Sequence, residues 1–172
     1  MPDSLWSNVE LIVVDTEAPL ADVLACVPNK VELLDEVPRR ILLAEKHYVN
    51  DGPLTTGGVF QIPGFTVVVP PTCHGFGRVG YTHWPEALSK RFGQAWLFST
   101  SLGVPGVIAF ERGVQVAAVT GDETVGDGLL GLTSVDYDRP DDILDAMGRL
   151  LGEDVKQLIR RGTGFLYEAS PD

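Results

Sequence analysis

Cysteine is scarce in this 172-residue chain, which has only Cys26 and Cys73. Two cysteines allow one disulfide at most, which excludes the disulfide framework that holds small secreted domains together. Long hydrophobic runs are also missing, because no stretch approaches the ~20 apolar residues that cross a bilayer. Residues 1–14 lack the pattern of a signal peptide. The sequence therefore predicts a cytoplasmic protein without a membrane segment.

Basic residues are few as well. Lys and Arg number 13 against 24 Asp and Glu, which gives a formal net charge of −11 at pH 7. Phosphate groups are bound by clustered Lys and Arg, and an anionic membrane surface attracts the same residues. The composition therefore argues against nucleic acid and against membranes as partners.

The apolar content of the chain and the pattern of its apolar residues predict a folded α+β protein with one domain over residues 1–172. Apolar residues make up 44% of the chain, as in proteins that bury a core. Apolar runs predict strands at 8–16, 30–36, 39–49, 59–62, 65–69, 94–101, 104–111 and 114–120. Apolar spacing predicts a helix at 18–27 and two short C-terminal helices at 140–152 and 153–162. Pro85 at a first helical position, Glu86 in the first turn and Gly93 as a stop predict a helix at 84–93. This order favours a mainly antiparallel sheet with helices on one face and the two short helices closing the C-terminus.

The stretch PPTCHGFGRVGYTHW (residues 70–84) concentrates residues that often carry chemistry. Gly75, Gly77 and Gly80 have the G-x-G-x-x-G spacing of a dinucleotide-binding loop. That loop needs a strand running straight into the glycines and an acidic residue further on for the ribose. Here five residues intervene after the strand, and residues 95–105 contain no acid. We therefore interpret the stretch as a turn-rich connection.

Cys73 in this stretch is a candidate nucleophile. A thiol becomes reactive when a histidine beside it favours the thiolate, and His74 or His83 would be that histidine, oriented by Glu45 or Glu86. An alternative function is thus a Cys-dependent hydrolase or transferase. The Cys and His residues of the stretch match no common zinc spacing, so we expect no metal and no cofactor.

Negative charge is concentrated towards the C-terminal end. Residues 120–155 carry ten acidic residues against two basic ones, which is most of the net charge of the chain. These acids fall in a predicted loop, a strand end and a helix start, and such positions can converge on one surface. The candidate partner-binding residues are Asp122, Glu123, Asp127, Asp136, Tyr137, Asp138, Asp141 and Asp142. The alternative interpretation is a solvated surface that only keeps the protein soluble.

An acidic surface attracts a basic protein partner and speeds its association. The leading hypothesis is therefore non-enzymatic protein binding, with a bacterial immunity protein that neutralises a co-encoded toxin as its most concrete form. Tyr137 would be the aromatic anchor among the acids. A third hypothesis is a small-molecule or peptide-binding module that uses Trp84, Trp96 and Phe98.

The order of five segments resembles that of small actinobacterial proteins of unknown function. The segments are GFTVVV, WPEALS, AWLFSTS, IAFERGVQVAAV and PDDILDAM, which lie within residues 64–147. The resemblance covers about half of the chain and implies no activity.

Overall fold

The computed structural model of the chain describes residues 9–44, 56–71, 83–100, 106–120, 123–125, 128–135 and 139–170. Its strands are β1 (Glu10–Val14), β2 (Val31–Pro38), β3 (Thr56–Ile62), β4 (Phe65–Val69), β5 (Gln94–Ser99), β6 (Gly106–Glu111), β7 (Val114–Thr120), β8 (Glu123–Val125) and β9 (Thr163–Ala169). Its helices are α1 (Leu20–Leu24), α2 (Arg39–Ala44), α3 (Trp84–Phe92), α4 (Pro140–Leu151) and α5 (Val155–Arg160).

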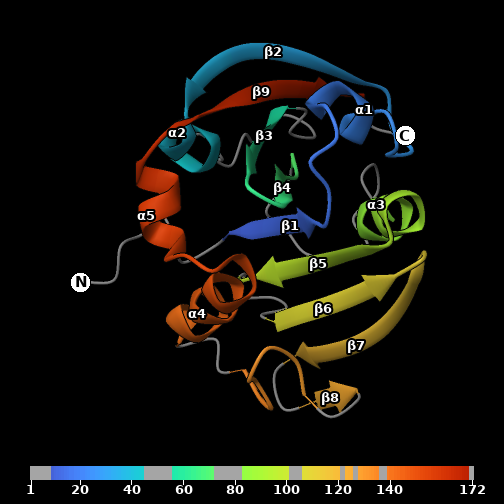
Figure 1. Cartoon of the computed structure of the whole chain (residues 1–172), viewed down its shortest axis with the longest axis vertical. Helices are drawn as coiled ribbons and strands as arrows, with labels where there is room; N and C mark the ends of the chain where they lie inside the picture. Colours follow the sequence, from blue (N-terminus) through green and yellow to red (C-terminus); the bar gives the residue numbers. More distant parts are fainter. Residues whose placement is uncertain are drawn as a thin grey trace, which may run out of the picture.

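Within these residues the strands form one nine-stranded sheet, in the order β2-β9-β3-β4-β1-β5-β6-β7-β8 (Figure 1). Every neighbouring pair is antiparallel, and the last strand of the chain, β9, lies between β2 and β3. β5 to β8 form a meander beside β1. The chain thus completes one half of the sheet only with its final strand.

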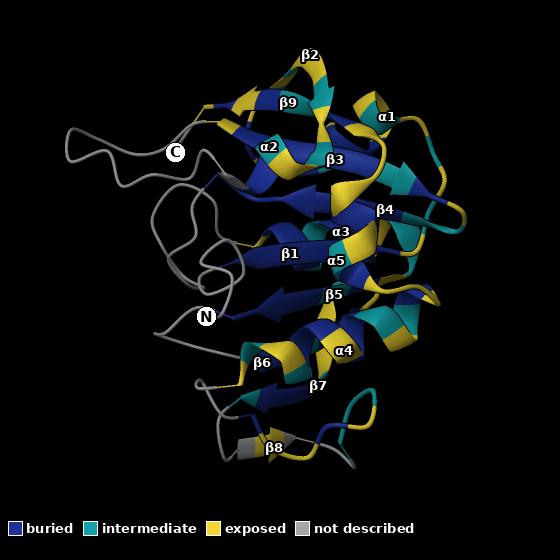
Figure 2. Cartoon of the chain, turned by 90° about the vertical axis from the view of Figure 1, so that its left-hand side faces the viewer, coloured by how far each residue is buried: buried dark blue, intermediate teal, exposed yellow. Residues whose placement is uncertain are grey.

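Helices cover both faces of the sheet. The side chains of a strand alternate between these faces, so one strand can contribute to an apolar cluster on each of them. Leu11 and Val13 of β1 belong to one apolar cluster with α2, α4 and α5, whereas Ile12 and Val14 belong to a second cluster with α1 and α3. Figure 2 shows the resulting buried interior between exposed outer surfaces. None of the helices in the described part of the chain has the length and apolar character that a bilayer crossing requires.

The predicted α+β class and the antiparallel sheet are confirmed. The predicted helices at 18–27 and 84–93 correspond to α1 and α3 and share one face, and the two C-terminal helices correspond to α4 and α5 on the opposite face. The helices of the fold are therefore not confined to one face. α4 and α5 also do not close the chain, because β9 follows them.

The strand predicted at 39–49 is wrong in its described part, since residues 39–44 form helix α2. Leu42 and Leu43 are adjacent, yet both are buried in the same apolar cluster. Neighbours in a strand would point to opposite faces, whereas neighbours in a helix can share one. A short apolar run such as ILLA does not distinguish the two by its spacing.

Candidate functional site

The acidic residues of the C-terminal region meet at the junction of α4 and α5. α4 begins at Pro140, and its C-cap is Gly152, whose φ of 78° lies in the left-handed region that glycine adopts without strain. The N-cap of α5 is Asp154, whose side chain accepts a hydrogen bond of 3.0 Å from the backbone N–H of Gln157. This tight connection brings α5 beside α4 and forms a hollow between them.

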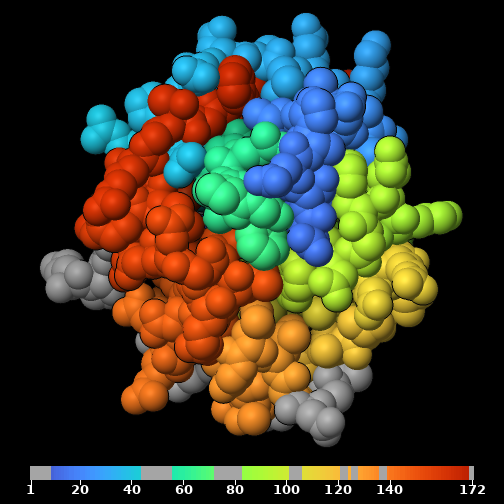
Figure 3. Space-filling model, viewed as in Figure 1, coloured from blue at the N-terminus to red at the C-terminus, as the bar shows by residue number. Residues whose placement is uncertain are grey.

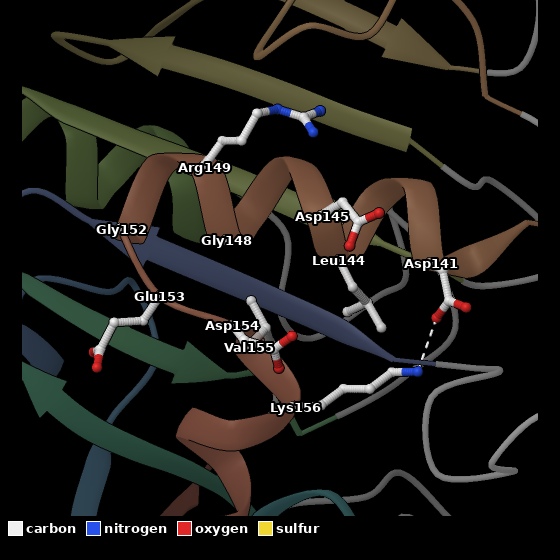
Figure 4. A pocket seen from close by; sticks show the side chains of 10 residues that line it. All are labelled: Asp141, Leu144, Asp145, Gly148, Arg149, Gly152, Glu153, Asp154, Val155 and Lys156. Atoms are coloured by element: carbon white, nitrogen blue, oxygen red, sulfur yellow. Dashed lines mark ion pairs between the residues drawn. The ribbon is translucent and has the colours of Figure 1, made fainter.

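The hollow is an open groove of about 600 Å³, which we call the α4–α5 groove. Figure 3 shows this C-terminal region, in orange and red, on the outer surface of the molecule. The groove is lined by Asp141, Leu144, Asp145, Gly148, Arg149, Gly152, Glu153, Asp154, Val155 and Lys156 (Figure 4). Leu144 and Val155 are buried and give it an apolar floor. Four carboxylates and two cations surround that floor.

One of the two cations of the lining is paired with a carboxylate. Lys156 Nζ lies 2.9 Å from Asp141 Oδ1 and joins the two helices (Figure 4). Arg149 extends from α4 on the side away from α5, where its Nε donates a hydrogen bond of 2.8 Å to the carbonyl of Leu130. Asp145 and Glu153 are exposed and form no ion pair with any described residue. With four acidic and two basic residues, the lining of the groove therefore has a negative net charge.

A second hollow of about 470 Å³ shares Glu153 and Asp154 with the groove and reaches Arg39. The guanidinium of Arg39 donates hydrogen bonds to the carbonyls of Thr163, Leu158 and Gln61, and lies 4.6 Å from the centre of the Phe60 ring. Burial lowers the pKa of Arg39, and the negative charge of Glu153 acts in the opposite direction. Arg39 thus joins β3, α5 and β9 in the second hollow, next to Glu153, and its role there is structural.

The structure places two of the eight predicted partner-binding residues with their side chains. Asp141 and Asp142 lie in the first turn of α4, where Asp141 lines the groove and Asp142 is half-buried. Glu123 lies in β8, and nothing is described of its side chain. The remaining five, which are Asp122, Asp127, Asp136, Tyr137 and Asp138, lie outside the described residues.

The groove also contains three acidic residues from the region 120–155 that are not among the eight predicted partner-binding residues. Asp145 follows Asp141 by four positions, so the two lie one turn apart on the same side of α4. Glu153 and Asp154 belong to the connection that brings α5 beside α4. The spacing of four residues from Asp141 is a signal in the sequence that would identify Asp145, whereas the position of Glu153 depends on how the turn folds.

The candidate thiol site is described only at its C-terminal end. Cys73 and His74 lie outside the described residues. His83 is exposed, has a positive φ of 68° immediately before α3, and its Nδ1 lies 3.8 Å from Glu86 Oε1. Glu86 Oε2 is buried and accepts no hydrogen bond from a described residue. His83 thus lies near a carboxylate, at a distance too long for a hydrogen bond.

The three aromatic residues proposed for a ligand-binding module do not form one surface. Trp84 is buried among the residues that α1 and α3 cover, whereas Phe98 is buried on the opposite face of the sheet. Trp96 packs edge-on against Phe65, with 6.3 Å between the ring centres. These side chains fill the cores of two layers. Among the described residues, no group of three or more His, Cys, Asp or Glu is arranged to hold a metal ion.

Comparison with known proteins finds no match among protein families, curated proteins or solved structures. Function must therefore be inferred from the residues themselves.

Proposed function

We propose that this protein is a non-enzymatic binding domain that holds a basic partner protein through the α4–α5 groove and the acidic surface around it. The observation that carries the proposal is the pair of exposed carboxylates, Asp145 and Glu153, beside an apolar floor and without an ion pair among the described residues. The proposal includes the cytoplasmic location that the sequence predicts.

The chemistry of the groove suits a lysine or arginine side chain. The methylene groups of the partner's side chain would pack on Leu144 and Val155, and its charged end would reach Asp145, Glu153 or Asp154. The net charge of −11 would also attract a basic protein from a distance and raise its association rate at low salt. The candidate residues between Asp122 and Asp138 belong to the same proposed surface.

The most concrete form of the proposal is a bacterial immunity protein that neutralises a basic toxin. Nucleases bind phosphate groups with clustered Lys and Arg, so an inhibitor that covers such a surface needs carboxylates. The partner would be encoded beside this protein, because toxin and inhibitor must be made together.

The test is a binding titration with the protein encoded by the adjacent gene, measured by calorimetry at low and high salt. Reversal of two groove charges, Asp145→Lys with Glu153→Lys, should weaken binding about tenfold or more. The matched control reverses two exposed acids elsewhere, Asp22→Lys with Glu111→Lys, and should retain most of the affinity. A groove variant that binds as tightly as the unchanged protein would contradict the proposal.

One observation supports a second candidate, the Cys-dependent enzyme. His83 beside Glu86 is the arrangement that would activate a neighbouring thiol. If Cys73 is that thiol, its alkylation by iodoacetamide at neutral pH should slow about tenfold in His83→Ala. Cys26, whose thiol donates to the carbonyl of Asp22, provides an internal reference in the same sample. Equal alkylation rates in the two proteins would remove this candidate.

A further inference from the structure

The outermost strand at one end of the sheet, β2, has an open edge. β2 is eight residues long and pairs only with β9 in the described part of the chain. Figures 1 and 2 show it at the rim of the molecule, with no described element beyond it. The edge of a sheet presents backbone N–H and C=O groups that can pair with a further strand. Natural proteins usually keep such strands short, and β2 is the longest strand described here.

The exposed side chains of β2 are mainly acidic. Glu32, Asp35 and Glu36 are all exposed and form no ion pair with any described residue. Leu34, between them, is 39% exposed, one of only three large apolar side chains exposed in the described chain. The ladder with β9 shifts by one residue between Leu33 and Glu36, which is a β-bulge. This edge therefore combines open backbone, one apolar side chain and three negative charges.

The charge decides which occupant fits. A second copy of the chain docking by the same edge would bring two sets of these carboxylates together, and like charges on paired strands repel. An acidic or neutral segment would leave the carboxylates unpaired. Leu33 packs on the cluster of α1 and α3 and Val37 on the opposite cluster, so the bulge places Glu36 on the other face from Glu32. A segment with Lys or Arg on both of its faces would place cations against these carboxylates.

We propose that the β2 edge binds an extended, Lys- or Arg-rich segment of a partner protein as an added antiparallel strand. Backbone hydrogen bonds would supply part of the affinity, and the carboxylates with Leu34 would select the sequence. This surface is separate from the α4–α5 groove, so it would give the protein a second contact with a basic partner or a contact with a different one.

The probe is a labelled eight-residue peptide, matching the length of β2, in which pairs of lysines alternate with valine–threonine pairs so that cations lie on both faces of the added strand. Two control peptides carry either glutamate in place of lysine, or proline in place of valine and threonine. The proline peptide keeps the positive charge but loses the N–H donors at those positions. Titration of the full chain by fluorescence anisotropy at low salt should show the lysine peptide binding about tenfold or more tightly than either control.

Two protein variants with equal loss of charge locate the contact. The β2 variant is Glu32→Gln with Asp35→Asn and Glu36→Gln, and the control variant changes three exposed acids outside both surfaces, Asp15→Asn with Asp22→Asn and Glu111→Gln. These substitutions keep side-chain size, and the thermal unfolding midpoint of each variant verifies that it is folded. The β2 variant should bind the lysine peptide about tenfold or more weakly, and the control should bind within about twofold of the unchanged protein.

Three results would overturn the proposal. A proline peptide that binds as tightly as the lysine peptide would mean that charge attraction acts without strand addition. An unaffected β2 variant would mean that the peptide binds elsewhere. Equal loss of binding in both variants would mean that the peptide responds only to the net charge of the protein.

Discussion

At the residue scale, Arg39 is the side chain that connects the largest number of elements around the site. It follows β2 directly and donates to the carbonyls of Gln61 in β3, Leu158 in α5 and Thr163 in β9. A lysine has no planar group with divergent donors and cannot reproduce the three bonds at once. Arg39 therefore fixes α5 to the sheet, and α5 directly follows the turn that carries Glu153.

We predict that Arg39→Ala lowers the free energy of unfolding by about 2–3 kcal/mol, because partly buried carbonyls lose a charged donor. Arg39→Lys should recover only part of that loss. Urea unfolding followed by circular dichroism measures both. Arg40→Ala changes an exposed neighbour in the same helix and should stay within about 0.5 kcal/mol of the unchanged protein.

Gly57 in β3 is a residue whose lack of a side chain is required. The hydroxyl of the buried Tyr167 donates a hydrogen bond of 2.6 Å to the carbonyl of Val69, and a Cβ on Gly57 would overlap both that hydroxyl and that carbonyl. We expect Gly57→Ala to destabilise the protein by about 1–3 kcal/mol through overpacking. Tyr167→Phe, which loses only the hydrogen bond, should cost about 1 kcal/mol. Thermal unfolding of both variants tests this order, and an unchanged midpoint for Gly57→Ala would contradict it.

At the element scale, β2 and β9 place two carboxylates opposite one another. Glu32 and Glu168 are register partners in the antiparallel ladder, and both are exposed. Like charges at such positions destabilise a strand pair, so Glu168→Lys should stabilise the protein by about 0.2–1 kcal/mol. Calorimetry measures the shift in the unfolding midpoint.

The control for that variant is Glu111→Lys, which changes the net charge of the chain by the same amount. Glu111 is exposed, and its register partners in β5 and β7 are Gln94 and Val114. Glu111→Lys should therefore change the unfolding midpoint little. Equal stabilisation by both variants would assign the gain to the net charge of the molecule.

Some elements can be predicted from the sequence and others cannot. Apolar periodicity predicted α4 closely, cap residues such as Pro85 and Gly93 predicted α3, and the turn residues Pro63 and Gly64 predicted the hairpin of β3 and β4. α2 was predicted as a strand because a short apolar run fits both structures. β9 was not predicted, because its pairing with β2 and β3 depends on residues far away in the chain. The candidate site follows the same rule. The concentration of acidic residues predicted Asp141, whereas the approach of Glu153 to α4 depends on the turn at Gly152.

At the scale of the whole molecule, β9 connects parts of the chain that are otherwise separate. β2 has no other ladder partner among the described strands, and Tyr167 of β9 packs against Trp84 with 5.9 Å between ring centres. Truncation before Thr163 should therefore abolish the cooperative unfolding transition. A synthetic peptide of residues 163–172 added to the truncated protein should restore it, as donated strands do in other sheets. A truncated protein that unfolds cooperatively without the peptide would show that the remaining strands form a stable sheet.

The separation of β2 and β9 along the chain also affects the protein during its synthesis. Residues 39–162 are translated after β2 and before its ladder partner. A nascent chain must therefore carry an unpaired β2 while these residues are made, and pairings between distant residues form slowly. The carboxylates of β2 would then protect the growing polypeptide on a polysome, because they discourage neighbouring nascent chains from joining at this strand.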